Sequence, residues 1–288
     1  MYSELVCRSN FSFLQGASHP EELIQAAAQL GLSAIALADA DGLYGVVKAH
    51  QAAKEAGLKH LIASELTLTD GPRVVVYAQD AGGYSNLCRL ISESRMTNPK
   101  GEAGISWRSV AERGSGLLAL LPYPAPVEKV ARLAEAFPER FYVGVNRTLS
   151  AGDEARVAQA RALSRELGAP LCAHNDVHTH HRKRQALQDV LTAIRHKTTL
   201  AQLGTRRFPN AERTLKGPEE MRWLFADLPE AVERTVELAG RCHATLDGLR
   251  YHFSEDDLPQ GHTGVSWLRE LTRRGLHVRY PGGVPADV

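Results

Sequence analysis

Short apolar segments alternate with segments of helical periodicity from the amino terminus to about residue 180. This alternation is typical of α/β proteins, in which helices cover a mainly parallel sheet. Glycines that follow the helical segments at Gly31, Gly57 and Gly168 favour helix ends there. The pattern predicts helices at 18–31, 44–56, 83–95 and 155–167, and strands at 4–8, 34–38, 60–64, 73–77, 116–121, 141–145 and 170–173.

The periodicity changes after His180, where helical patterns continue without intervening strands. We expect helices at 184–195, 218–225 and 229–242, which would form an appendage on the barrel or sheet. A Pro- and Gly-containing stretch follows, with a short helical pattern at 266–274. The sequence therefore predicts a domain over 1–255 and a linker over 256–288. At the start of the first helix, Ser18 and Glu21 have the spacing of a capping box.

The charge composition gives no general sign of nucleic-acid or membrane binding. Lys and Arg number 34 against 33 Asp and Glu, and aromatic residues make up 6% of the chain. The four cysteines have no paired spacing, which argues against a zinc ribbon or a disulfide framework. No apolar stretch approaches the roughly 20 residues that span a bilayer. These features predict a cytoplasmic protein with no membrane partner.

Acidic residues and a histidine come directly after three of the predicted strands. Asp39 follows 34–38, Glu65 follows 61–64, and Asp176 and His178 follow the last strand. In a closed α/β barrel the carboxyl ends of the strands meet at one mouth, so these four side chains would meet there. Carboxylates and imidazole suit a divalent transition metal, and several such ligands could hold more than one ion for phosphate-ester hydrolysis.

Each of these residues also has a simpler interpretation. Asp39 could be the amino-terminal cap of the next helix, and Asp176 could form an Asx-turn beside a surface histidine. The run from His178 to Arg184 could bind metal or phosphate, although such runs are usually solvated loops. Cys7 and Cys172 lie in apolar strands and are expected to fill core volume.

Several separated motifs resemble one protein family. Ser9–Leu14 with Gly16–Leu23 resembles the opening of the PHP (polymerase and histidinol phosphatase) domain of bacterial C-family DNA polymerases, and Gly83–Ser92 resembles their GYxNLCRLIS signature. Leu187–Arg195 with Pro209–Arg213 is similar to the error-prone branch. The resemblance covers essentially all 288 residues. It implies an α/β fold, a distorted (β/α)7 TIM-like barrel with a helical C-terminal appendage.

The resemblance implies that active members of this family bind two or three metal ions at the barrel mouth through His, Asp, Glu and Cys side chains. Position by position, this sequence keeps Asp39, Glu65, Asp176 and His178 as a remnant of that site. The degenerate ligand positions are Val6, Arg8 and Ala40. Valine and alanine offer no lone pair, and arginine remains protonated. The remnant could hold one weakly bound divalent ion, but no tightly bound cofactor and no multi-metal site are expected.

The resemblance implies the amino-terminal domain of an error-prone polymerase acting in DNA repair and translesion synthesis. Its expected role is a scaffold without catalytic residues. The expected partners are the rest of the polymerase chain and, through the parent, DNA and mutagenesis proteins, and the parent's cofactor is Mg²⁺. The alternative is a stand-alone metal-dependent phosphoesterase or exonuclease of the superfamily, which the degenerate positions disfavour. We further expect Arg8 to lie among Asp39, Glu65 and Asp176 in place of the metal.

Overall fold

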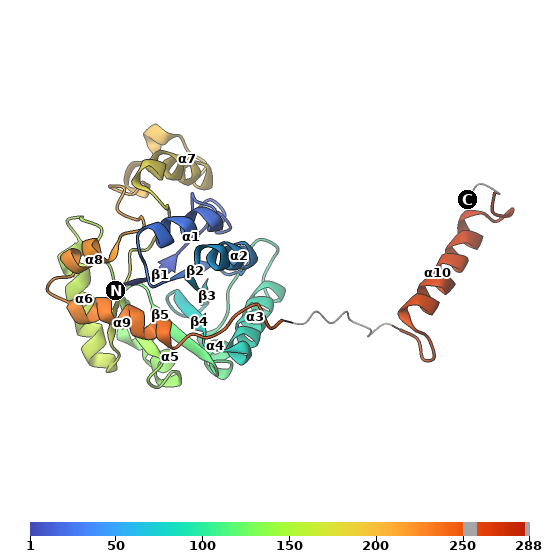
Figure 1. Ribbon diagram of the computed structural model, residues 1–288, viewed down its shortest axis with the longest axis horizontal. Coiled ribbons are helices and arrows are strands. Elements are labelled where there is room, and N and C mark those ends of the chain that lie inside the picture. Colours follow the sequence, from blue (N-terminus) through green and yellow to red (C-terminus); the bar gives the residue numbers. More distant parts are fainter. Residues whose placement is uncertain (250–257, 286–288) are drawn as a thin grey trace. The chain divides into compact units, whose positions relative to one another are not determined.

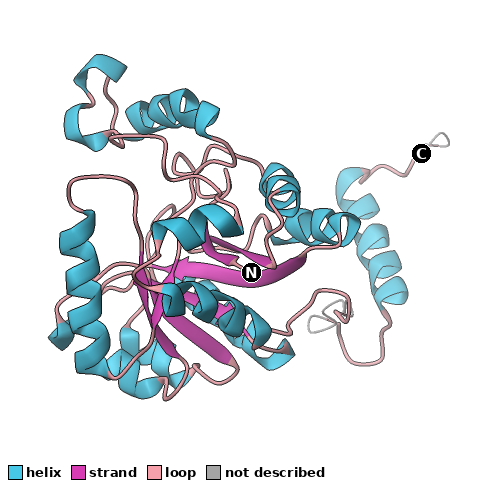
Figure 2. Cartoon of the chain, turned by 60° about the vertical axis from the view of Figure 1, so that its left-hand side comes forward, coloured by secondary structure: helices cyan, strands magenta, loops and turns pink. Residues whose placement is uncertain are grey.

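The computed structural model describes residues 1–249 and 258–285. Two compact units divide the chain, Met1–Leu246 and Asp247–Val288. The domain boundary predicted at residue 255 lies in 250–257, outside the described residues. The larger unit contains seven strands surrounded by helices (Figure 2).

The seven strands form one sheet whose spatial order follows the chain. This arrangement, with helices outside the strands (Figure 1), is a distorted α/β barrel, as the sequence predicts. The predicted strands are all present, with ends shifted by a few residues. Their bounds are β1 Ser3–Cys7, β2 Ala34–Ala40, β3 Lys59–Leu66, β4 Val74–Ala78, β5 Leu117–Leu121, β6 Phe141–Val145 and β7 Leu171–Ala173.

One strand departs from the predicted parallel architecture. β4 runs antiparallel to both of its neighbours, β3 and β5, whereas the other strand pairs are parallel. The physical reason is the short connection from β3 to β4, residues 67–73, since a parallel crossover needs roughly a dozen residues or more. The prediction of a parallel sheet was therefore wrong for the direction of β4. The short connection between β3 and β4 that explains this is visible in the sequence.

The two ends of the sheet approach each other through the segment that follows β7. The amide of Val177 donates to the carbonyl of Val6 at 2.8 Å, and the amide of Arg8 donates to the carbonyl of Val177 at 2.9 Å. Helix α9 (Pro229–Gly240) packs against both β1 and β7. The barrel interior is filled by buried apolar side chains that include Val6, Leu61 and Tyr77. The mouth therefore borders an apolar interior.

The helices outside the barrel agree with the periodicity for every long segment. Their bounds are α1 Pro20–Gln29, α2 Val46–Ala56, α3 Ala81–Met96, α6 Asp153–Leu167, α7 Gln185–Arg195 and α8 Pro218–Leu224. Two short helices, α4 Trp107–Glu112 and α5 Ala131–Ala136, have too few turns to give a periodic signal. The smaller unit contains α10, Gly264–Arg279. None of the described helices has both the length and the apolar character needed to cross a membrane.

The capping box predicted for α1 was displaced by one residue. His19 is the N-cap, and its amide donates to the Glu22 carboxylate at 2.9 Å. Ser18 instead accepts from the amide of His180 at 2.9 Å and contacts that residue's imidazole. Because Pro20 occupies the first helical position, the cap falls at the residue before it. Ser18 thus ties the start of α1 to the segment after β7.

Candidate functional site: the barrel mouth

Arg8 follows the last residue of β1 and lies at the mouth of the barrel, only 3% exposed. Its guanidinium donates to both oxygens of Glu65, from Nη2 at 2.6 Å and from Nε at 3.3 Å. Nη1 forms an ion pair with Asp176 and lies 3.1 Å from Nε2 of His178. Arg8 therefore joins three of the four residues that the sequence suggests as metal ligands.

Strand register explains why Glu65 reaches this cluster. Glu65 lies within β3, not after it as predicted, and pairs with Ala40 of β2. Side chains alternate between the two faces of a sheet, and paired residues on neighbouring strands share a face. Glu65 has the same parity as Leu61 and Ala63, which line the barrel interior. Its carboxylate consequently points inward, toward Arg8.

Asp39 does not join the cluster, so the expectation that Arg8 would lie against it was wrong. Asp39 pairs with Ser64, one residue out of phase with Glu65, and so faces the opposite way. Its carboxylate accepts from the Ser9 amide at 2.8 Å, the Ser9 hydroxyl at 2.7 Å and the Ser12 hydroxyl at 2.6 Å. Nor does it cap α2, whose N-cap is Gly45. Burial raises the pKa of Asp39, and these hydrogen bonds lower it only partly.

His178 is held as a neutral imidazole. Its Nδ1 lies 2.6 Å from the carbonyl oxygen of Gln15, which can only accept, so Nδ1 carries the proton. Nε2 is then the acceptor for Arg8. Burial, followed by the charge of Arg8, lowers the pKa of His178 to about 3. The lone pair that a metal ion would need is therefore used by the guanidinium.

Asp176 is paired with two arginines. In addition to Arg8, it forms an ion pair with Arg213, whose guanidinium lies 4.5 Å from the centre of the Phe208 ring. The backbone of Asp176 is in the left-handed region, with φ of 50°. β7 ends at Ala173, before these residues, so strand geometry does not place Asp176 and His178. Arg8, not strand geometry, brings them together.

The charges at the mouth stabilise one another. Burial alone would raise the pKa of Glu65, but the charge and hydrogen bonds of Arg8, with a smaller contribution from Arg73, lower it. Burial likewise lowers the pKa of Arg8, but the charge and hydrogen bond of Glu65, together with smaller contributions from Tyr123, more than offset this effect and raise it. Both groups are therefore ionised at neutral pH. The cluster is a desolvated ion-pair network in which the positive charge is supplied by the protein.

The mouth does not fit a metal ion. Both Glu65 oxygens, one Asp176 oxygen and the free lone pair of His178 are directed at Arg8, and Asp39 is turned away toward Ser9 and Ser12. Throughout residues 1–249 and 258–285, no three His, Cys, Asp or Glu side chains are grouped so as to hold a metal ion. A divalent ion would also have to share the space with a permanently charged guanidinium.

Val6 and Ala40, two positions where the family resemblance implies metal ligands, have ordinary structural roles in the barrel. Val6 is fully buried in the interior core, and the amide of Ala40 donates to the Ser12 hydroxyl at 3.0 Å. In the basic run after His178, Arg182 pairs with Glu212 and Glu220, and Arg184 pairs with Glu22. This run is therefore engaged in surface ion pairs. Cys7 and Cys172 are buried free thiols within the core, as predicted.

Sequence reasoning missed four residues of the site. Arg73 approaches Glu65 at 3.2 Å, and Arg213 pairs with Asp176. His174 donates through Nε2 to the carbonyl of Pro122 at 2.8 Å and accepts the Asp176 amide at 3.2 Å, while Tyr123 packs edge-on against it. Burial lowers the pKa of His174 to about 4. For Arg73 and Arg213, the sequence signals only that the buried acids Glu65 and Asp176 need positively charged partners. It does not show which arginines fill that role.

Residues 4–148 match the PHP domain family. The chain is 47% identical to the error-prone DNA polymerase of Anaeromyxobacter sp. strain K over 263 residues, which is 86% of this chain and 23% of that protein. It is 44% identical over its whole length to the error-prone DNA polymerase of Methylococcus capsulatus, of which it covers 28%.

The chain thus spans about a quarter of the length of these relatives. The error-prone DNA polymerase of Pseudomonas aeruginosa gives a similar result, at 41% identity over the whole chain and 28% of the relative. Among solved structures, a putative metal-dependent phosphoesterase from Bifidobacterium adolescentis aligns with a TM-score of 0.48 and 14% identity. That alignment covers 78% of this chain and 95% of the other.

Proposed function

The chain belongs to the PHP domain family, and we propose that it is a PHP domain of an error-prone DNA polymerase that has lost hydrolytic activity. Three relatives with that name are 41–47% identical to it over most or all of its length. Each is about four times longer, so the polymerase active site would lie in the remaining part. On this account the domain is a scaffold and partner platform for that part.

One observation supports the proposed loss of activity: Arg8 contacts the side chains that would bind a metal ion. Metal-assisted hydrolysis of a phosphate ester needs open coordination positions and an activated water molecule. Here the inward-facing donors Glu65, Asp176 and His178 are all satisfied by a guanidinium. The fixed positive charge stabilises the acids without supplying an ion that could activate water.

The same similarity supports a finer proposal about the parent polymerase. We propose a cytoplasmic nucleotidyltransferase that uses Mg²⁺ and deoxynucleotides in DNA-damage repair and translesion synthesis. Its partners would be DNA and other replication or mutagenesis proteins. The identity to named error-prone polymerases supports this proposal.

The direct test is an assay for exonuclease and phosphatase activity on the purified 288-residue chain with Mn²⁺ or Zn²⁺. We expect no hydrolysis of single-stranded DNA or of p-nitrophenyl phosphate above the level without protein. Primer extension should also be absent. Robust hydrolysis that Asp176→Ala abolishes would contradict the proposal and favour the metal-dependent phosphoesterase. Circular dichroism of that variant would show whether it still folds.

A further inference from the structure

Helix α7 buries polar side chains and exposes apolar ones. Its buried residues are Gln188, Thr192 and Ala193, and the first two are only 2% and 4% exposed. Its exposed large apolar residues are Leu187 at 42%, Val190 at 39% and Ile194 at 55%. A surface helix of a globular protein ordinarily turns its apolar stripe toward the core. In α7 this order is reversed.

The three exposed apolar residues form one stripe along α7, because they are spaced three and four residues apart. We call Leu187, Val190 and Ile194 the α7 stripe. The helix lies on the outside of the barrel (Figure 1), and its main contacts are with the short turns η2 (Arg182–Arg184) and η3 (Leu200–Gln202). Single exposed apolar side chains are common on protein surfaces, whereas a continuous stripe of them marks an interaction site.

The segment that contains α7 is strongly basic, although the chain as a whole is nearly neutral. Residues 182–213 hold eight Lys or Arg and two acidic residues, whereas the net charge of the chain is +1. Both acids, Asp189 and Glu212, already pair with arginines. Four of the basic side chains are exposed and have no ion-pair partner among the described residues, namely Lys183, Arg195, Lys197 and Arg206.

These four charges lie at the two ends of α7. Lys183 precedes the helix in η2, Arg195 is its last residue, and Lys197 follows two positions later. Desolvation lowers the pKa of His196, and the charges of Arg195 and Arg206 lower it further, so Arg206 also lies near the carboxyl end of α7. The α7 stripe is therefore bordered by positive charge at both ends.

An apolar stripe at helical spacing with positive charge beside it complements an amphipathic helix that carries acidic residues. Packed helices bring such stripes together, and complementary charges beside them select the partner. A second copy of this chain would bring the same positive charges and be repelled. A single nucleic-acid strand would stack on aromatic side chains, and the α7 stripe has none.

We propose that the α7 stripe docks an acidic amphipathic helix of a partner protein. Val190 and Ile194 pack between the apolar side chains of that helix, and Arg195 and Arg206 pair with its carboxylates. The inference rests on the role of partner platform proposed above, and it names the surface and the chemistry of the partner. It does not depend on the loss of hydrolytic activity, which the nuclease assay tests separately.

Fluorescence anisotropy of the 288-residue chain with two labelled helical peptides tests this proposal. Both peptides are about 18 residues long, which favours helix formation, and carry leucines at helical spacing. One has Glu and the other Lys at the positions beside the leucines. We expect the acidic peptide to bind with a Kd of roughly 100 μM or less, and the basic peptide to bind about tenfold more weakly. Ile194→Ser and Arg206→Glu should each weaken binding of the acidic peptide about fivefold or more.

Two variants outside this segment serve as matched controls. Val47 on α2 is an apolar side chain that is 56% exposed, and Arg89 is an exposed arginine on α3. Val47→Ser and Arg89→Glu should leave binding of the acidic peptide unchanged. Thermal melts establish that each variant is folded, and all of the substituted side chains are exposed.

Three results with the peptides would overturn the proposal: no binding of the acidic peptide at millimolar concentration, equal binding of the two peptides, or binding that neither Ile194→Ser nor Arg206→Glu weakens. Two further measurements test the other occupants. A dimer in sedimentation equilibrium that Ile194→Ser abolishes would assign the α7 stripe to a second copy of the chain. Displacement of the acidic peptide by a single-stranded oligonucleotide, but not by excess unlabelled peptide, would assign it to nucleic acid.

Discussion

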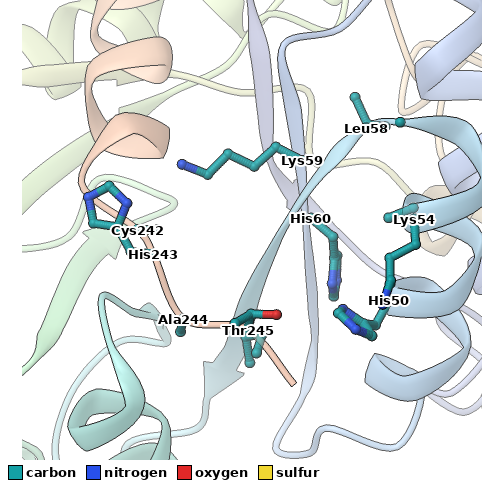
Figure 3. Close-up of a pocket in the computed structure, with 12 residues that line it drawn as sticks. His50, Lys54, Leu58, Lys59, His60, Cys242, His243, Ala244 and Thr245 are labelled. Atoms are coloured by element: carbon teal, nitrogen blue, oxygen red, sulfur yellow. The ribbon is translucent and has the colours of Figure 1, made fainter. Parts of the chain in front are cut away.

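The two ends of the barrel satisfy charge in different ways. At the mouth, Arg8 lies among buried acids and a neutral histidine, so the partners come from the protein itself. At the opposite end, His50, Lys54 and His60 line an open pocket with no acidic residue in its walls. An internal ion-pair network therefore fills the mouth, whereas the other end of the barrel keeps an open cavity (Figure 3). The mouth should therefore respond strongly to loss of its cation.

Replacing Arg8 should have the largest effect. Arg8→Ala leaves Glu65 and Asp176 with fewer cationic partners in a buried setting, which should cost about 3 kcal/mol of the free energy of unfolding at pH 7. Urea denaturation of the variant and the wild type measures this difference. An unchanged free energy of unfolding would mean that water, not Arg8, solvates these carboxylates.

The destabilisation caused by Arg8→Ala should shrink in acid. In the wild type the pKa of Glu65 is lowered, so its contribution to stability is present above pH about 4.3 and is lost as the pH falls through the folded value. Without Arg8, burial favours the protonated acid, and acid should then relieve the penalty. Urea denaturation at pH 7 and pH 5 should show a deficit smaller by roughly 1 kcal/mol at the lower pH. A deficit that grows in acid would contradict this interpretation.

His178 should make the wild type sensitive to acid. Its folded pKa is about 3, below the unfolded value of about 6.5, so the unfolded chain binds the extra proton first. Between these two pH values its contribution to stability falls as pH falls, by roughly 1 kcal/mol per pH unit. His178→Gln should flatten that part of the stability profile. A profile with the same slope in the variant would assign the effect to other histidines, such as His174.

Replacing Arg73 should have the smallest effect on stability, and it serves as a control for the replacement of Arg8. It pairs with the same carboxylate at 3.2 Å, but its side chain is 44% exposed. Exposed ion pairs contribute little, so Arg73→Ala should cost less than 1 kcal/mol. Thermal melts in low and high salt would measure this loss and its screening. A cost equal to that of Arg8→Ala would show that burial does not distinguish the two arginines.

The sequence predicted the fold better than the site. Long helices and apolar strands have clear periodicity, so their positions were correct within a few residues, and β4 was wrong only in direction. For the site, the sequence anticipated that Glu65, Asp176 and His178 meet at the mouth and that Arg8 contacts Glu65 and Asp176. Asp39 could not be placed, because a strand only slightly longer than predicted determines which way it faces. Arg73 and Arg213 depend on tertiary packing, which no local pattern encodes.

Mn²⁺ binding at the mouth tests the central claim most directly, because Mn²⁺ and the Arg8 guanidinium need the same donors. Electron paramagnetic resonance of free Mn²⁺ would be titrated with the wild type and with Glu65→Gln, which keeps the size of the side chain. We predict that, at a millimolar concentration of Mn²⁺, the wild type and Glu65→Gln remove the same small amount of the ion from solution. A bound ion in the wild type that Glu65→Gln loses while remaining folded would contradict it.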